Sequence, residues 1–304
     1  MRRGWRAAAA RVQARRMMDR HTLTNGYLSA TVRADGAELC SLRDAEDTEL
    51  LWQAGPAWPR HAPVLFPIVG RLKDDTLRHQ GRTYRLTQHG FARDRRFAWL
   101  SRSATACRLV LHDDPDARAV YPFAFRLELA YALDDDALSW TMTVTNPGRE
   151  VLPCALGAHP AFAWPLAAGV EKDAHVLEFA EEEKAPIRRV IGGLLDPAPH
   201  PSPVAGRRLA LDPALFEADA VIFDQLASAS VRYTAPGAET IEISWDGFRQ
   251  LGVWQRVGAD FLCIEPWFGM ASPVDWDGPF VEKPGLMLIP PGDQRSCSLR
   301  IRLC

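Results

Sequence analysis

The chain of 304 residues is 47% hydrophobic and 24% charged, which is typical of a soluble globular protein with a large buried core. Its formal net charge of -2 gives no electrostatic reason to expect nucleic acid or an anionic membrane as a partner. No apolar stretch approaches the roughly 20 residues that a membrane-spanning helix needs, so we expect neither partner.

The first 20 residues form a basic segment of arginines around an alanine tract, in which Asp19 is the only acid. A secretory signal would carry an apolar core of about 7–15 residues, and an organelle transit peptide would be rich in serine. The segment has neither feature. We therefore expect residues 1–20 to be a disordered tail without a role in the chemistry, with Met17 or Met18 as the natural start.

Beyond this segment, short β-type stretches alternate with turn signals. Apolar and polar residues alternate over 27–32 and 37–42, on either side of an Asp-Gly turn signal. The same period of two runs through 125–131 and 137–145, which are separated by three consecutive aspartates. This pattern predicts an antiparallel hairpin.

Further β-type segments predict strands as far as the C-terminus, at 49–52, 84–86, 97–100, 107–111, 231–233, 240–245, 250–254, 261–264, 286–289 and 296–303. Helical periodicity outside the tail is confined to 212–216, and the proline- and glycine-rich stretch 192–208 reads as a long surface loop. Regularly spaced short strands are typical of sandwiches and barrels. We predict an all-β fold, with one large antiparallel β-sandwich domain over 21–304.

The six cysteines are scattered, without a Cys-x-x-Cys pair, and most lie among β-type residues. This usage predicts reduced thiols in the core of a cytoplasmic protein.

One acidic residue closes an apolar run. Glu265 follows four apolar residues over 261–264 and precedes Pro266, which keeps it extended. This pattern predicts a buried strand that delivers Glu265 to its end, beside the aromatic surface of Trp267 and Phe268. A carboxylate there is costly unless it is paired or functional, although a solvent-facing glutamate at a strand end is the common alternative.

Three other segments carry polar residues in site-like surroundings. Arg71 follows an apolar run and Gly70, His89 lies between Gln88 and Gly90, and His159 precedes a proline and an aromatic residue. Each has an ordinary alternative, since an arginine after a turn or a lone histidine is commonly structural or solvated. Together they supply imidazoles and a guanidinium that could work with one carboxylate.

Other chemistries lack their signatures. The eight histidines form no His-x-His or His-Glu-x-x-His pattern, so we expect no metal site. There is no Gly-x-Ser-x-Gly elbow of a hydrolase and no glycine-rich nucleotide loop. What remains is an acid–base set that can move protons on a polyol without a cofactor.

Four motifs resemble the aldose 1-epimerase (galactose mutarotase-like) family, closest to its bacterial branch. They cover 63–73, 88–94, 157–162 and 263–269, and they occur in the family's order. The resemblance spans essentially all of 21–304 and implies a single antiparallel β supersandwich.

The resemblance also implies roles for individual residues. Glu265 stands where the family has its general base, and His159 where it has its general acid. His89 and Arg71 match positions that bind sugar hydroxyls. Asp219 is the best match for an aspartate that holds the sugar, with Asp224 as an alternative.

Aromatic residues near these motifs are candidates for stacking on the sugar ring, with ordinary core packing as the alternative. They are Trp267, Phe268, Phe162 and Trp164. The expected partner is a small-molecule aldose, and the protein is expected to be a monomer or homodimer without a cofactor.

Three functions stay open. The first is epimerisation of a free hexose at C1. The second is the same chemistry on a hexose 6-phosphate, for which Arg93, Arg95 and Arg96 would supply cations, although a solvated basic loop is the plainer interpretation. The third is non-catalytic carbohydrate binding, against which the presence of both Glu265 and His159 argues.

Overall fold

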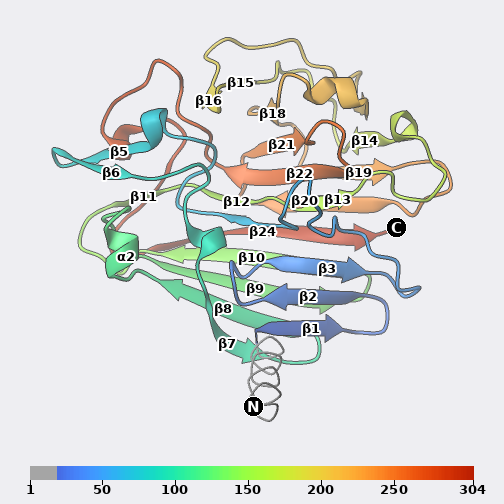
Figure 1. Ribbon diagram of the computed structural model, residues 1–304, viewed down its shortest axis with the longest axis horizontal. Coiled ribbons are helices and arrows are strands. Elements are labelled where there is room, and N and C mark those ends of the chain that lie inside the picture. Colours follow the sequence, from blue (N-terminus) through green and yellow to red (C-terminus); the bar gives the residue numbers. More distant parts are fainter. Residues whose placement is uncertain (1–18) are drawn as a thin grey trace, which may run out of the picture.

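The computed structural model describes residues 19–304, and strands dominate them (Figure 1). The predicted tail over 1–20 lies outside the described residues except at its end. There Asp19 pairs with Arg96, and the first strand begins at Arg20, one residue before the predicted start of the domain.

In chain order the strands are β1 (Arg20–Thr24), β2 (Ser29–Arg33), β3 (Leu39–Arg43), β4 (Val64–Leu65), β5 (Thr76–His79), β6 (Arg82–Arg85), β7 (Ala98–Arg102), β8 (Ala106–His112), β9 (Arg126–Asp134), β10 (Ala137–Thr145), β11 (Leu152–Cys154), β12 (Leu156–Ala158), β13 (Ala161–Ala163), β14 (Val176–Phe179), β15 (Val190–Ile191), β16 (Leu194–Leu195), β17 (Arg208–Ala210), β18 (Val221–Phe223), β19 (Ser230–Thr234), β20 (Ile241–Asp246), β21 (Gln250–Trp254), β22 (Phe261–Phe268), β23 (Met287–Ile289) and β24 (Gln294–Leu303).

The helical elements of this part of the chain are one α-helical turn, α2 (Pro115–Arg118), and the 3₁₀ turns η1 (Lys73–Asp75), η2 (Ala92–Asp94), η3 (Lys172–Ala174), η4 (Pro213–Phe216) and η5 (Phe280–Glu282). The prediction of an all-β fold with few short helices is therefore confirmed. Within residues 19–304, no helix has both the length and the apolar character to span a membrane.

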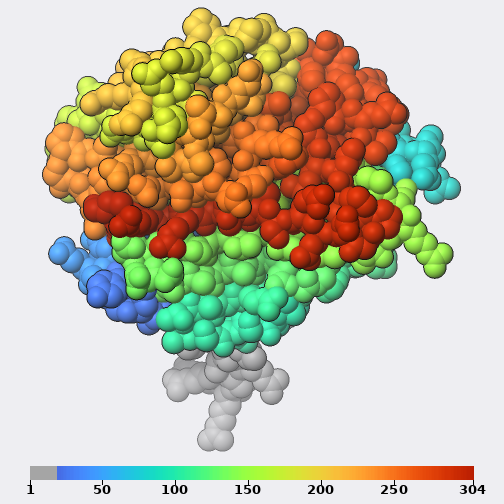
Figure 2. Space-filling model, turned by 180° about the vertical axis from the view of Figure 1, so that it is seen from behind, coloured from blue at the N-terminus to red at the C-terminus, as the bar shows by residue number. Residues whose placement is uncertain are grey.

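The largest sheet has nine strands in the order β17-β14-β19-β20-β24-β10-β9-β8-β7. The predicted hairpin lies near its centre, where β9 and β10 pair antiparallel from Asp134 opposite Ala137 onward. On its other edge β10 pairs with β24, so the C-terminal strand crosses the back of the molecule beside the hairpin (Figure 2).

A second sheet of six strands carries the order β18-β21-β22-β12-β4, with β13 also pairing β22. In Figure 1 its strands β21 and β22 lie in the upper half and β8 to β10 of the larger sheet in the lower half. The small sheet β1-β2-β3 and the pairs β5–β6, β11–β23 and β15–β16 complete the arrangement.

Side chains of β22 alternate between two environments because successive residues of a strand point to opposite faces. Leu262 and Ile264 join the main core, which also holds Leu138 and Trp140 of β10. Burying each such side chain contributes roughly 1.5–3 kcal/mol. Because Glu265 directly follows Ile264 in the strand, its side chain projects from the opposite face of the sheet, away from this core.

Several local predictions need correction. Glu265 does not end its strand, because β22 continues through Pro266 to Phe268. The ladder tolerates this proline because the gap between β12 and β13 lies opposite it, so the missing N–H is not needed there. The segment 49–52 forms only isolated bridges, since its residues pair singly with Arg43 and Phe162.

The stretch 192–208 is not an irregular loop throughout. It holds β16, which pairs with β15, and it carries the buried Leu195. In contrast, the short helical prediction at 212–216 is confirmed by η4, whose first turn is capped by the Asp212 carboxylate accepting the Ala214 N–H. All six cysteines lie in the described residues as free thiols, and only Cys304 among them is exposed.

Candidate functional site

A cavity of about 360 Å³ opens on the face of the six-stranded sheet that is turned away from the main core. Its volume lies in the range of about 300–1,000 Å³ that small-molecule sites occupy. Of the residues predicted from the sequence, His89, His159, Asp219, Glu265 and Trp267 line it. Arg71 does not.

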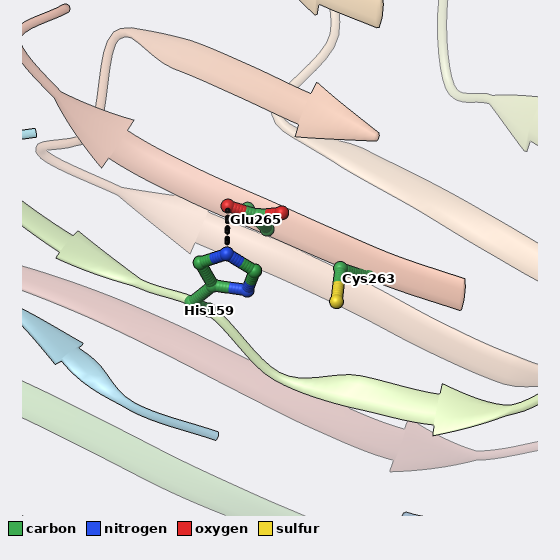
Figure 3. Close-up of side chains that lie close together, drawn as sticks. All are labelled: His159, Cys263 and Glu265. Carbon is green, nitrogen blue, oxygen red and sulfur yellow. Dashed lines mark ion pairs between the residues drawn. The ribbon is translucent and has the colours of Figure 1, made fainter. Parts of the chain in front are cut away.

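The sheet register brings His159 opposite Glu265. β12 pairs Gly157 with Trp267 and β13 pairs Ala161 with Cys263, so both strands have the same register against β22. His159 lies in the gap between them, and its Nε2 is 3.2 Å from Oε2 of Glu265. Figure 3 shows the two side chains pointing toward one another.

Both members of this pair are buried, with 6% of His159 and 2% of Glu265 exposed. Burial disfavours the charged form of each group. It lowers the pKa of His159 to about 3, helped by the positive charge of Arg93. It raises the pKa of Glu265 well above its ordinary value, and the negative charge of Asp219 adds to this effect.

In the absence of sugar, these two pKa shifts place the single proton shared by Glu265 and His159 on the carboxyl group. Glu265 is then a carboxylic acid that donates to a neutral imidazole. The expected working form, with a carboxylate and an imidazolium, differs from it by transfer of one proton across the 3.2 Å contact.

Aromatic rings enclose His159. Trp58 stacks on its imidazole with the ring centroids 5.0 Å apart, and Trp254 meets it edge-on at 5.9 Å. Its Nδ1 is buried without a hydrogen-bond partner among the described residues. An orphaned buried nitrogen is costly and is a common sign of a functional site.

His89 is held in a turn that closes the other side of the pocket. Its φ is 64°, and Gly90, which follows it, has φ of 70°. A Cβ at Gly90 would lie 2.3 Å from the carbonyl oxygen of Phe66, so only glycine fits.

The backbone of Gly70 fixes the imidazole of His89. The Gly70 N–H donates to Nδ1 at 3.2 Å, and the His89 N–H donates to the Gly70 carbonyl at 2.8 Å. The ring centroid lies 5.7 Å from that of His159. Poor solvation and the charge of Arg93 lower the pKa of His89 well below its usual range, so it enters the site as a neutral donor and acceptor.

Of the two aspartates considered from the sequence, only Asp219 lines the cavity. It has φ of 65°, and its Oδ1 accepts the N–H of Ala220 at 2.8 Å. Asp224 is instead paired with Arg188 at 2.9 Å, away from the cavity wall. The geometry therefore favours Asp219, whose contact with sugar stays a prediction.

Arg71 does not line the cavity. Its Nε is 2.8 Å from Oδ1 of Asp75, and its aliphatic part packs against the cavity-lining Gly193. Glu265, His159 and His89 therefore meet at one cavity, which the guanidinium of Arg71 does not line. Its contact with sugar stays a prediction.

The aromatic candidates separate clearly. Trp267 lines the cavity, and its ring passes over Gly252, where a Cβ would lie 2.2 Å from the indole. Phe162 of β13 and Trp164, which follows that strand, are fully buried in the main core, so both fit the alternative of ordinary core packing. Phe268 faces away from the cavity and packs beneath the guanidinium of Arg249.

Among the polar and aromatic cavity residues, Trp58, Gln88, Trp254 and Arg256 were not predicted to contact the sugar, and Arg93 was considered only as a cation for a hexose 6-phosphate. Gln88 and Arg93 belong to the motif around His89, and that proximity was a usable signal. Trp58 and Trp254 carry no local signal, since only the fold brings them to His159.

Among residues 19–304, Cys263 is the side chain that joins the pair in a possible metal-binding group. One donor atom each from Cys263, His159 and Glu265 lie within 4.8 Å of one another (Figure 3). Burial and the neighbouring Glu265 raise the pKa of the thiol well above its ordinary value. A metal that bound here would have to displace the thiol proton.

Comparisons with known proteins agree with the geometry. A family model described as aldose 1-epimerase matches residues 19–274. Protein LacX, in its plasmid-encoded form from Lactococcus lactis subsp. lactis, is 30% identical over 293 residues, which cover 92% of this chain and 98% of LacX.

Solved structures show the same fold along nearly the whole chain. A galactose mutarotase related enzyme from Lactobacillus acidophilus matches with a TM-score of 0.88 and 30% identity, covering 94% of this chain and 97% of its own. A galactose mutarotase-like protein from Lactobacillus casei ATCC 334 gives the same TM-score and identity, over 94% of this chain and 100% of its own. The predicted galactose mutarotase-like fold is confirmed, and the chain belongs to the aldose 1-epimerase family.

Proposed function

We propose that the protein interconverts the α and β anomers of a hexose by opening and reclosing the sugar ring. One observation carries this proposal: an imidazole and a carboxyl group lie 3.2 Å apart and buried in a cavity of small-molecule size. Family membership supports an isomerase that acts on aldoses. The proton-transfer steps and the choice of sugar are our inference.

Ring opening needs one base and one acid. Glu265, as carboxylate, takes the proton of the anomeric hydroxyl, and the electron pair of that O–H bond forms the C1 carbonyl. The bond between C1 and the ring oxygen breaks as the imidazolium of His159 gives its proton to that oxygen. The aldehyde then turns about the C1–C2 bond and recloses from its other face, while both protons return.

The burial of the pair assists the opening step. Opening converts a carboxylate and an imidazolium into a carboxylic acid and a neutral imidazole. The raised pKa of Glu265 and the lowered pKa of His159 favour that neutral product. A dry site therefore stabilises the enzyme form that accompanies the open-chain aldehyde.

The remaining residues of the cavity would keep the sugar in place while C1 reacts. His89 and Asp219 offer hydrogen-bonding groups on two sides of the pair, and Trp267 offers a flat apolar face. Contacts to the sugar hydroxyls would keep C1 within reach of Glu265 and His159. The entropic cost of bringing the acid and the base to C1, which the reaction in water must meet, is then met by substrate binding. Because only protons move, the proposed reaction needs no cofactor.

The test is polarimetry of freshly dissolved single anomers, screened over free and phosphorylated aldoses. Glu265→Gln and His159→Asn are each expected to lose about 10²–10⁴-fold in kcat, the usual contribution of one general acid or base. Glu178→Gln, an exposed carboxylate paired with Arg207, is the matched control and should keep the wild-type rate.

Two outcomes would contradict the proposal. If the wild-type protein binds sugars without accelerating the mutarotation of any of them, it is a carbohydrate-binding protein on an enzyme scaffold. If Glu265→Gln turns over at the wild-type rate, Glu265 is not the base.

A further inference from the structure

His159 lacks the contact that usually orients a histidine which transfers protons. Such an imidazole is commonly held by a hydrogen bond from its second ring nitrogen to a carboxylate or a backbone carbonyl. Here Nε2 faces Glu265 at 3.2 Å, whereas Nδ1 is buried without a hydrogen-bond partner among residues 19–304. The side-chain hydrogen bonds of His159 therefore fix one point of the ring and leave its plane undetermined.

Trp58 supplies a contact that fixes this plane. Its indole stacks on the imidazole with an interplanar angle of 29° and ring centroids 5.0 Å apart. The same indole stacks on Phe261 of β22 at 5.3 Å and meets Trp254 of β21 edge-on at 5.9 Å. Because Phe261 is fully buried, Trp58 is packed against the strand that carries Glu265 while it covers the ring of His159.

The loop that carries Trp58 is bonded at both ends to the segment that follows His159. On the N-terminal side of the loop, the Trp52 N–H donates to the Ala161 carbonyl at 2.9 Å. On the C-terminal side, the Ala161 N–H donates to the His61 carbonyl at 2.9 Å. The loop is thus fixed relative to the backbone of the residue that it covers.

A second tryptophan fixes Trp58 within this loop. Nε1 of Trp52 donates to the Trp58 carbonyl at 2.8 Å, and the Trp58 N–H donates to the Gly55 carbonyl at 3.1 Å. A Cβ at Gly55 would lie 2.9 Å from the Trp52 ring, so the loop closes tightly on that indole. These contacts place Trp58 over His159 without the help of a bound sugar.

The cover that Trp58 provides also keeps water from His159. Burial is the largest cause of the lowered pKa of His159, and the charges of Arg93 and Arg60 act in the same direction, whereas Glu38 opposes them. The charged and titratable groups around the ring are Glu265, His89, Arg93, Arg60, Glu38, Asp219 and Arg256. A substitution of Trp58 leaves all of them in the chain, so its effect on the proton affinity of His159 reports hydration and stacking.

Two effects of the indole on this proton affinity oppose one another. The face of an indole attracts an imidazolium, which favours the charged ring. Exclusion of water favours the neutral ring, and full burial can lower the pKa of a histidine by up to about 3–5. Because burial is the largest cause of the shift at His159, we expect removal of the indole to raise the pKa.

We propose that Trp58 is a positioning residue, which stacks on His159 to hold its imidazole across from Glu265 and to keep water off the pair. A carboxylate bonded to Nδ1 would also orient the ring, but it would stabilise the imidazolium. An apolar cover orients the ring and leaves the imidazolium a stronger acid toward the ring oxygen of the sugar. The inference rests on the proposed function for the reaction, though not for the state of the His159 ring.

The first test follows the His159 imidazole by NMR from pH 8 to about pH 4.5 and needs no substrate. In the wild type the C–H resonances, assigned from their absence in His159→Asn, should stay constant, because the pKa is about 3. In Trp58→Ala they should titrate within this range as water reaches the ring. Trp58→Phe, which keeps an aromatic ring over the imidazole, should restore the wild-type behaviour.

Two further variants keep this test decisive. Trp99→Ala removes another half-buried tryptophan, on the edge strand β7 of the nine-stranded sheet, and should leave the His159 resonances constant. Trp58→Leu keeps an apolar side chain and replaces Trp58→Ala if circular dichroism shows that the latter is unfolded. Constant His159 resonances in the folded Trp58 variant, or a titration in Trp99→Ala, would overturn the inference.

Mutarotation kinetics test the role of Trp58 in the reaction. In Trp58→Ala the acid limb of kcat/KM should move up to the midpoint found by NMR, and kcat at pH 7 should fall by about 10- to 100-fold, because a misplaced acid loses its reach to the sugar. Trp58→Phe should recover most of this loss. A raised KM with unchanged kcat would make Trp58 only a sugar-stacking residue, and lost stability with an unmoved acid limb would make it only a packing residue. Either result would overturn the inference.

The two measurements separate this inference from the proposed function. Titration of His159 in Trp58→Ala, in a protein that accelerates mutarotation of no aldose, would remove the reaction and retain the effect of Trp58 on the ring. Mutarotation by the wild type, with constant His159 resonances in folded Trp58→Ala, would retain the enzyme and overturn the role of Trp58.

Discussion

The protonation state of His159 makes a quantitative prediction for the pH dependence of catalysis. The pair works with one shared proton, and a second proton inactivates it. An ordinary imidazole with a pKa of 6.5 would be about 97% protonated at pH 5. With a pKa of about 3, His159 would be about 1% protonated there, so the acid limb of kcat/KM, which reports the sugar-free enzyme, should have its midpoint well below pH 5.

The assay is the initial rate of mutarotation from pH 4 to pH 8, after subtraction of the buffer-catalysed rate at each pH. Circular dichroism at each point shows that the protein stays folded. A parallel NMR titration of the imidazole C–H resonances, with the His159 signal assigned from its absence in His159→Asn, reports the same proton directly.

A midpoint near pH 6.5 in both measurements would refute the reasoning. It would mean that the His159 imidazolium is stable in the cavity, and that burial does not control the proton of the pair. Burial of the pair would then not favour the open-chain form of the sugar.

Three further predictions concern residues around the pair. Gly252→Ala places a Cβ 2.2 Å from the Trp267 indole, so we expect a loss of about 1–3 kcal/mol in urea denaturation and a raised KM as the ring is displaced. Asp219→Asn removes the charge that helps to raise the pKa of Glu265, so the alkaline limb of kcat should move to lower pH; a limb that stays in place would contradict this. Lys283 is buried with its pKa lowered to about 8, so its ammonium group destabilises the folded protein until it loses its proton. The free energy of unfolding of the wild type, relative to that of Lys283→Met, should therefore rise by roughly 3 kcal/mol between pH 8 and pH 10.5. Thermal or urea unfolding measures this difference, and a difference that stays constant with pH would refute the prediction.

The sequence predicted the strands well where one local pattern decides the structure. The segment 137–145 forms β10 with the predicted bounds, because period-two alternation directly indicates a strand with one face in the core. The segment 250–254 also forms β21 with the predicted bounds, although four of its five residues are buried without alternation. The helical turn at 213–216 was equally local, since an aspartate and a proline start it. The pairing of β15 with β16 within 190–195 was missed, because two-residue strands leave no periodicity to detect.

The site was predictable in its residue types but not in its contacts. Arg71 shows the limit: Asp75 lies four residues later and takes its guanidinium in a pair that no motif indicates. Trp58 and Trp254 lie far apart in the chain and reach His159 only through the packing of three segments. Such contacts depend on cross-strand register, which single-sequence patterns do not contain.

The position of His159 opposite Glu265 depends on two strand pairings that share one register. β12 and β13 flank His159, and each keeps the same register on β22, so the interruption between them places the imidazole directly across from the carboxyl group. Pro266 contributes by having no N–H to demand a partner at that interruption. Burial disfavours the ionised pair, a carboxylate with an imidazolium, and favours the neutral pair, a carboxylic acid with an imidazole. The fold therefore favours the proton transfer from His159 and to Glu265 that we propose for the opening of the sugar ring.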